Sequence, residues 1–304
     1  MNRVMKYIIL SPGYDDDSGG IVVLHQLCDR LNQLGYQGLL WPIFKPVFDS
    51  KQPLKSLYLF FRYFRKTLKY GYALNPKLKT PVATNQDLED SIVIYPEIIV
   101  GNPLNAKRVV RWLLHKPGFN NGGKIDFGKD DLFFYYDKAY DDSRFNSYPD
   151  NLLHIISQRK DVYKIINNER RKGTCYLLRK GNKRPIVHNV TDSILIDGMS
   201  HEETAKVFNQ TEFCISYDTY TMYTVYAAMC GCIPIIIPEE GVSKEEWQPT
   251  EENRYGMAYG FDDIDYATST RELFLEKLER QEQESNQSVQ HFVEKCNAYW
   301  KIKN

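Results

Sequence analysis

The stretch that decides the fold is residues 213–237, which read FCISYDTYTMYTVYAAMCGCIPIII. The apolar run at 213–217 predicts a buried strand, and the small residues from 222 to 230 predict a helix. Gly231 and Pro234 then lead into a second apolar run that ends at residue 237. A strand, a helix and another strand in this order predict a βαβ unit, whose strands lie parallel in one sheet.

The same alternation extends along the rest of the chain. Further strands are expected at 7–10, 92–95, 132–136, 174–178 and 193–196, with another apolar run at 152–156, and helices at 21–34, 106–115 and 201–209. Two polar helical patterns follow at 268–284 and 287–300. We therefore expect an α/β fold of two Rossmann-like domains with C-terminal helices. The charged stretch 157–173 has no apolar periodicity, so the expected domains are 1–157 and 158–267, with helices at 268–304 packing back across them.

Charge and composition exclude some classes of protein. The 304 residues carry 39 Lys+Arg and 39 Asp+Glu, so the formal net charge is zero. Neutrality disfavours a general polyanion binder, and no nucleic-acid module is recognised, so we expect no nucleic-acid partner. The charge is nevertheless segregated, because 45–80 and 159–184 are basic and 238–286 is acidic. The 22 Tyr residues suit stacking on sugars or bases, although a tyrosine-rich core is the ordinary alternative.

Targeting signals and metal motifs are absent from the pattern. The apolar run at 7–10 is too short for a signal peptide, and no window approaches the ~18 apolar residues of a membrane span. The six cysteines form no CxxC pair and have no matching histidine spacing. We expect a reduced, cytoplasmic protein without structural zinc or a cofactor.

Three segments carry candidate chemistry. Residues 18–20 read SGG ahead of the first helix, where glycines let a ligand approach the helix N-terminus, although a plain tight turn has the same composition. Residues 179–184 read RKGNKR after a predicted strand, where Arg and Lys can hold a diphosphate, and a solvated turn is the alternative. Residues 217–224 carry a run of hydroxyl and phenol groups at another strand's carboxyl end.

The order of these features resembles the donor domain of GT-B glycosyltransferases, especially the retaining family 4 type. Arg179 and Lys183 follow a strand, 196–203 read IDGMSHEE, and a strand and small-residue helix lead to CGCIP at 230–234. The glycine loop at 18–20 is similar to the opening of the acceptor domain in that family. The family's Glu-x7-Glu motif is replaced here by Asp218-x7-Tyr226.

The resemblance implies a nucleoside-diphosphate sugar as donor. Its diphosphate would lie between Arg179, Lys183 and the backbone N–H groups near 221–224, and its base against 197–200. Asp218 could accept a hydrogen bond from a sugar hydroxyl, and the Tyr226 phenol could bond or stack. The donor-binding candidates are Gly19, Gly20, Arg179, Lys183, Asp197, Gly198, Met199, Tyr217, Asp218, Thr219, Tyr220, Thr221, Met222, Tyr223, Thr224 and Tyr226.

The resemblance also implies that cationic side chains replace a divalent ion. Asp15-x-Asp17 is similar to the metal-binding motif of the other glycosyltransferase fold, but it precedes the glycine loop and is interpreted as a polar turn. Glu97 follows a predicted strand and could position or deprotonate an acceptor hydroxyl, which makes Glu97 and Asp218 the catalytic candidates. His25 and His115 are alternatives for which a structural role is more ordinary.

Residues 53–70 predict a basic amphipathic helix. Its apolar stripe is Leu54, Leu57, Tyr58, Phe61, Phe64 and Leu68, and Lys55, Arg62, Lys66 and Lys69 point away from it. Such a helix can lie on an anionic membrane surface, which suits a lipid-linked acceptor. The alternative is a helix packed on the sheet with a solvated basic face.

These observations favour a glycosyltransferase that moves a sugar to a glycan or lipid-linked acceptor in bacterial-type surface polysaccharide synthesis, in the cytoplasm or at the inner face of the membrane. The main alternative is a GT-B-like protein that binds a nucleotide-sugar or glycan without turnover. An unrelated two-domain Rossmann-like enzyme is a third, although the absence of GxGxxG disfavours an oxidoreductase.

Overall fold

The computed structural model describes residues 5–16, 18–156, 158–166 and 169–302. The chain divides into two compact units. Unit 1 comprises residues 1–157 and 282–304, and unit 2 comprises residues 158–281. Asp17 of the predicted Asp-x-Asp turn lies outside the described residues.

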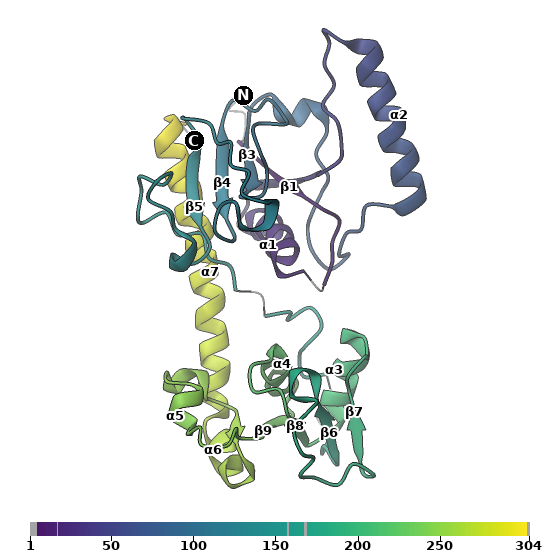
Figure 1. The fold of residues 1–304 in the computed structure, drawn as a ribbon, viewed down its shortest axis with the longest axis vertical. Helices are drawn as coiled ribbons and strands as arrows, with labels where there is room; N and C mark the ends of the chain where they lie inside the picture. The colour runs from purple at the N-terminus through teal and green to yellow at the C-terminus, as the bar shows by residue number, and fades with distance from the viewer. Residues whose placement is uncertain (1–4, 17, 157, 167–168, 303–304) are drawn as a thin grey trace. The chain divides into compact units, whose positions relative to one another are not determined.

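Unit 1 contains a parallel sheet of five strands in the order β2-β1-β3-β4-β5 (Figure 1). Its elements are β1 Lys6–Ser11, α1 Gly19–Gln33, β2 Gln37–Pro42, α2 Pro53–Tyr70, β3 Ser91–Pro96, β4 Val109–Leu113 and β5 Leu132–Tyr135. The long helix α7, Arg271–Trp300, contributes its residues from 282 onward to this unit.

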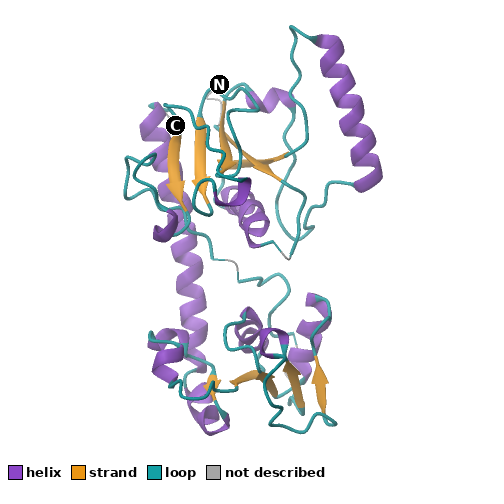
Figure 2. Ribbon diagram, viewed as in Figure 1, coloured by secondary structure: helices purple, strands orange, loops and turns teal. Residues whose placement is uncertain are grey.

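Unit 2 contains a second parallel sheet of five strands, in the order β10-β9-β8-β6-β7. Its elements are β6 Thr174–Leu177, β7 Ser193–Leu195, α3 His201–Gln210, β8 Phe213–Ser216, α4 Met222–Cys230, β9 Ile233–Ile236, α5 Lys244–Trp247, β10 Ala258–Tyr259, α6 Ile264–Ser269 and the start of α7. Figure 2 shows that loops, rather than helices, make several of the connections in both units.

The core of unit 1 lies mainly between its sheet and the helices α1 and α7. Leu27 and Leu31 of α1 and Phe292 of α7 are fully buried against the strands. The other sheet face is covered by side chains from loops, including Ala83 and Leu104. The amphipathic stripe of α1 therefore folds onto one face only.

The core of unit 2 also has two layers. Phe208 of α3 and Ala227 of α4 pack on one sheet face together with Phe274 of α7. The opposite face carries Ile215 and Ile235, covered by Ala267 of α6. The predicted α/β class, with two Rossmann-like parallel sheets and a C-terminal helix, is confirmed.

One predicted element is wrong in kind. The helix predicted at 106–115 is the strand β4, in which every residue is buried. Even Arg111 is hidden, because its guanidinium donates to Asp131 at 2.7 Å and to the carbonyl of Ile99 at 2.8 Å. A strand buried on both faces shows no alternation, so its pattern cannot be told from that of a buried helix.

The two helices predicted at the C-terminus are one. α7 is continuous over 30 residues, because no glycine or proline interrupts it. The Ser285 hydroxyl within the expected break accepts a hydrogen bond from the Ile156 N–H at 3.1 Å. The strands β2 and β10 were not predicted, and the run at 152–156 forms only an isolated bridge from Leu152 to Tyr135.

No helix within the described residues is long and apolar enough to cross a bilayer.

Candidate functional site

Both sheets have the same strand order, which selects one position in each for a ligand. Numbered within its own unit, each sheet runs 2-1-3-4-5, so the second strand lies on one side of the first and the third strand lies on the other. Open α/β sheets bind ligands outside the carboxyl ends of the strands at such a switch point. In unit 2 this point lies between β6 and β8, and in unit 1 between β1 and β3.

At the switch point of unit 2, a short 3-10 helix, Arg179–Gly181, packs directly on the chain that leaves β8. A Cβ atom on Gly181 would lie 2.0 Å from the carbonyl oxygen of Tyr217, so only glycine fits. The loop after β6 and the loop after β8 are therefore in backbone contact. This contact brings the predicted basic loop and the predicted hydroxyl-rich loop together.

Arg179 reaches from the first of these loops to α4. Its φ of 40° is positive, and its guanidinium carbon lies 4.6 Å from the centre of the Tyr223 ring in the first turn of α4. A cation beside the N-terminus of a helix adds to the partial positive charge of the free N–H groups there. Lys183 is exposed on the same loop. These groups together can attract an anion such as a diphosphate.

Asp197 and Arg184 hold this arrangement in place. The Asp197 carboxylate accepts hydrogen bonds from the Leu178 N–H at 3.1 Å and the Arg179 N–H at 2.9 Å. Arg184 donates to the carbonyl of Tyr217 at 2.9 Å and to that of Pro238. Asp197 and Arg184 therefore fix the turn, while Arg179 and Lys183 remain at the surface.

The other residues predicted to face the base have mixed roles. Gly198 has a positive φ of 84° and open space where a side chain would begin. Met199 is half-buried against the core of unit 2, and Ser200 caps α3 by accepting from the Glu203 N–H at 3.3 Å. Gly198 and Ser200 are exposed, but the Ser200 hydroxyl is engaged in the helix cap, so the open backbone at Gly198 is the better contact for a ligand.

Most hydroxyls of the loop after β8 are bound by the chain itself. Tyr217 is fully buried, and its hydroxyl accepts from the Val187 N–H at 2.9 Å. Thr221 caps α4 by accepting from the Tyr223 N–H at 3.3 Å. Thr224 donates to the carbonyl of Thr221 at 2.9 Å.

The acidic member of this loop is largely enclosed. Asp218 is 5% exposed, and its carboxylate accepts from the Tyr220 N–H at 3.2 Å. The Thr219 hydroxyl beside it donates to Glu239 at 2.6 Å. Tyr220 and Met222 are the exposed side chains of the loop, at 62% and 48%.

Tyr226 lies in an aromatic cluster. Its ring stacks on Tyr163 with the centroids 4.1 Å apart and the planes at 5°. The Tyr163 hydroxyl lies 2.5 Å from Nδ1 of His201, whose ring in turn stacks near Tyr223. Burial raises the pKa of Tyr163 well above its usual value. Tyr226 is 8% exposed, so it acts here chiefly as a packing residue.

Two residues near this site were not predicted. Glu239 follows β9 at its carboxyl edge, a position that could have signalled it. Tyr163 lies in the charged stretch 157–173 and stacks on Tyr226, which is distant in the sequence. No local sequence signal therefore indicates this contact.

In unit 1, the predicted residues gather at the ends of β3 and β4. Gly19 and Gly20 form the first turn of α1, and a Cβ on Gly20 would lie 3.9 Å from Leu114. The Glu97 carboxylate accepts from the Leu114 N–H at 3.2 Å. Glu97 is 4% exposed, and burial raises its pKa. A carboxyl group with a raised pKa is better suited to take a proton near neutral pH.

The two histidines differ in setting. His25 is fully buried beside Tyr14, with Nε2 3.0 Å from the carbonyl of Pro12, and burial lowers its pKa. His115 stacks against Phe119 at 4.3 Å and Tyr140 at 5.0 Å. Gly19, Gly20, Glu97 and both histidines belong to unit 1, whereas the other predicted site residues belong to unit 2.

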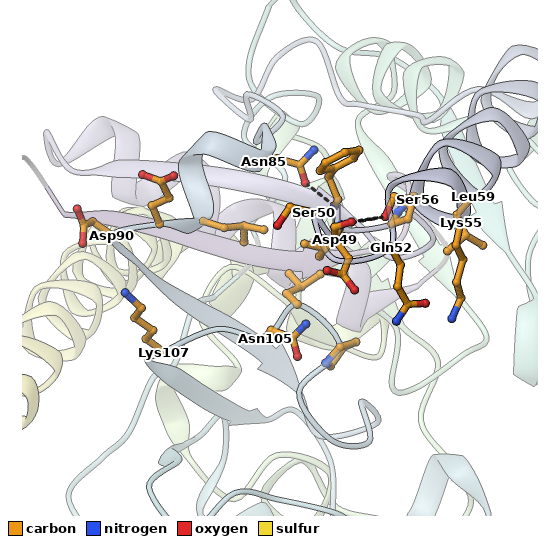
Figure 3. A pocket seen from close by; sticks show the side chains of 17 residues that line it. Asp49, Ser50, Gln52, Lys55, Ser56, Leu59, Asn85, Asp90, Asn105 and Lys107 are labelled. Carbon is orange, nitrogen blue, oxygen red and sulfur yellow. Dashed lines mark hydrogen bonds between the residues drawn. The ribbon is translucent and has the colours of Figure 1, made fainter.

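A cavity of 1020 Å³ also lies in unit 1, away from these residues (Figure 3). Its wall includes Asp49 and Ser56 from the region of α2, and Asp90 and Lys107, which precede β3 and β4. The cavity therefore reaches the amino ends of these strands, opposite to the edge at which α/β sheets bind their ligands.

Within the described part of the chain, no group of three or more His, Cys, Asp or Glu side chains could hold a metal ion.

Comparison with known proteins finds distant likeness among solved structures. No protein-family model and no curated protein matches the chain. Among solved structures, a sucrose-phosphate synthase from Thermosynechococcus elongatus is similar, with a TM-score of 0.32 and 11% sequence identity over 94% of each chain. A likeness this distant assigns no function.

Proposed function

We propose that this protein is a GT-B glycosyltransferase that transfers a sugar from a nucleoside-diphosphate sugar to a glycan or lipid-linked acceptor. The observation that supports it most is the switch point of unit 2. There, the close approach at Gly181 brings the loop of Arg179 against the loop that precedes α4. A diphosphate is the ligand whose charge matches a guanidinium, an exposed lysine and a helix N-terminus.

These groups would act on the leaving group. As the bond between the sugar C1 and the diphosphate oxygen breaks, its electron pair passes to that oxygen. Arg179, Lys183 and the N–H groups of α4 would stabilise the resulting charge, which is the role of a divalent ion in metal-dependent transferases. The acceptor oxygen bonds to C1 and releases its proton to a base.

The candidates for sugar binding and for proton transfer are both carboxylates. Asp218 would bind a sugar hydroxyl. Glu97, with its raised pKa, is the candidate base on the acceptor side. Retention of anomeric configuration is part of the proposal through the family resemblance.

A second candidate function is binding without turnover. Tyr226 occupies the position at which family 4 GT-B glycosyltransferases, which this chain resembles, have a glutamate. Its ring packs on Tyr163. Asp218 is largely enclosed, and most hydroxyls of its loop are bonded within the chain. A site of this kind could bind a nucleotide-sugar without the contacts that assist bond cleavage.

The test is a panel of UDP-, GDP-, TDP- and CMP-sugars, assayed by calorimetry and for transfer or hydrolysis. Arg179→Ala should weaken binding of the active donor by about tenfold or more, the value of a charge-assisted hydrogen bond. Lys180→Ala is the matched control, since Lys180 is exposed on the same 3-10 helix without the Tyr223 contact.

The outcomes separate the proposals. Transfer that depends on Arg179 supports the transferase. Binding without turnover, with acceptors present, favours the second function. Binding of no member of the panel contradicts both. We further propose that the transferase works on surface polysaccharide at the cytoplasmic face of the membrane.

A further inference from the structure

α2 presents three distinct faces along its 18 residues. One face is attached to unit 1: Ser56 is buried, and Phe60, Tyr63 and Thr67 are half-buried. The Asp49 N–H donates to the Ser56 hydroxyl at 2.9 Å, and the rings of Phe48 and Phe60 lie 6.5 Å apart. This spacing of i, i+4, i+7 and i+11 defines one side of the helix.

The second face is the apolar stripe, Leu54, Leu57, Tyr58, Phe61, Phe64 and Leu68. These side chains are 58% to 83% exposed, so the stripe does not pack on the sheet. In Figure 1, α2 stands apart from the sheet of its own unit and joins it through loops at both ends. Apolar side chains gathered on one face of a helix and left in solvent mark an interaction surface.

The third face is cationic. Lys55, Arg62, Lys66 and Lys69 recur at i, i+7, i+11 and i+14, next to the stripe, and all are exposed. Arg65 interrupts the apolar stripe between Phe61 and Tyr58, with its guanidinium 5.9 Å from the Phe61 ring. The 18 residues of α2 contain these five basic side chains and no acidic one.

Together these faces favour one occupant over others. An apolar stripe bordered by cations, on a helix without acidic residues, matches a bilayer with anionic headgroups, which supplies an apolar layer and a negative plane. A second copy of the chain docked through the same face would bring two sets of five cations together. We propose that α2 docks this protein on an anionic lipid surface, with the apolar stripe inserted at the headgroup level and the basic face on the headgroups.

Docking through α2 rests on the helix alone. The lipid-linked class of the acceptor rests in addition on the proposed function, since a transferase held at a bilayer meets acceptors that are anchored there. Vesicle binding and nucleotide-sugar binding are therefore measured on the same variants, so that one can fail without the other.

The test is co-sedimentation of the full chain with vesicles of phosphatidylcholine alone or of phosphatidylcholine mixed equally with phosphatidylglycerol. The protein should bind the anionic vesicles and bind the neutral ones much less. Phe61→Ser with Phe64→Ser should weaken binding about tenfold or more, because two large apolar side chains leave the bilayer. Arg62→Glu with Lys66→Glu should weaken it at least about as much, and on anionic vesicles only.

Matched controls come from exposed sites elsewhere. Ile186→Ser with Val190→Ser removes two exposed apolar side chains of unit 2, at 44% and 43% exposure. Lys124→Glu with Lys129→Glu makes the same change in net charge as the α2 charge variant, at two exposed lysines of unit 1. Both control pairs should bind vesicles as the parent protein does.

Three results would overturn the proposal. The first is no binding of the folded protein to anionic vesicles. The second is equal loss in the control and α2 variants. The third is that the parent protein forms a dimer and does not bind vesicles, and that the Phe61 and Phe64 substitutions dissociate this dimer. That result would assign the stripe to contact with a second copy of the chain. Phe61→Trp tests insertion without removing the stripe, because the emission of the new indole should shift to the blue on anionic vesicles only.

Discussion

Gly181→Ala should destabilise unit 2 and displace its basic loop. The new Cβ would start 2.0 Å from the Tyr217 carbonyl oxygen and 2.3 Å from its carbon. Real Cβ contacts stay beyond 3.0 Å, so the two loops must separate by about 1 Å. The neighbour is backbone and cannot rotate away, so we expect the upper part of the range for overpacking, about 3 kcal/mol.

Part of this cost is offset in the unfolded chain. Replacing glycine by alanine reduces the entropy of the unfolded state, which is worth up to about 1 kcal/mol. A net loss of about 2 kcal/mol remains, which corresponds to roughly thirtyfold faster amide exchange in a strand that opens with its unit. The measurement is native-state hydrogen exchange by mass spectrometry on peptides that cover β8.

Gly19→Ala is the matched control. Gly19 lies in the first turn of α1, has no atom within 4 Å of its Cβ position and does not have a positive φ. Its substitution should leave exchange in both units unchanged or slightly slower. If the Gly181 variant keeps β8 protected within about 0.5 kcal/mol of the parent, the backbone contact between the two loops is not present in solution.

Three further substitutions test other contacts. Arg111→Met leaves the buried Asp131 without its cation and should cost about 3–5 kcal/mol in unfolding free energy, and a loss below about 1 kcal/mol would contradict the pairing. Asp197→Ala leaves two N–H groups of the basic loop without an acceptor and should cost about 3 kcal/mol by hydrogen exchange in unit 2, whereas Asp197→Asn should keep most of the stability. Burial raises the pKa of Glu97 above its ordinary 4.5, so the stability that this group contributes is complete below that pH and is lost as the pH rises through the folded-state pKa. Glu97→Gln should therefore raise the melting temperature near pH 7 and leave it unchanged near about pH 4, and an equal effect at both pH values would refute the assignment.

Local sequence pattern was sufficient for most strands and for the small-residue helix. β3 and β8 lie within one residue of the expected bounds, and α4 begins and ends at the expected residues. These elements have a continuous apolar run or a glycine at their end, and Gly231 has the positive φ of 88° that a helix C-terminus favours. Each signal is contained within a few neighbouring residues.

The remaining features depend on contacts between distant segments. β4 could not be distinguished from a helix, because Arg111 within it is neutralised by Asp131, which directly precedes β5. The tight contact of Gly181 with Tyr217 and the stacking of Tyr163 on Tyr226 require the register of two strands and a loop. Sequence pattern indicated the two loops that meet at the switch point of unit 2, but not which of their side chains face inward.

The division of α7 between the units has a consequence for synthesis of the chain. Val289, Phe292 and Cys296 belong to the buried core of unit 1, although most of that core is encoded before residue 157. A ribosome therefore releases every residue of unit 2 before unit 1 has the helix that covers one face of its sheet. During synthesis, one sheet face of unit 1 stays partly uncovered until α7 has left the ribosome. Unit 2, although it is second in the sequence, is therefore the first unit that can complete its fold.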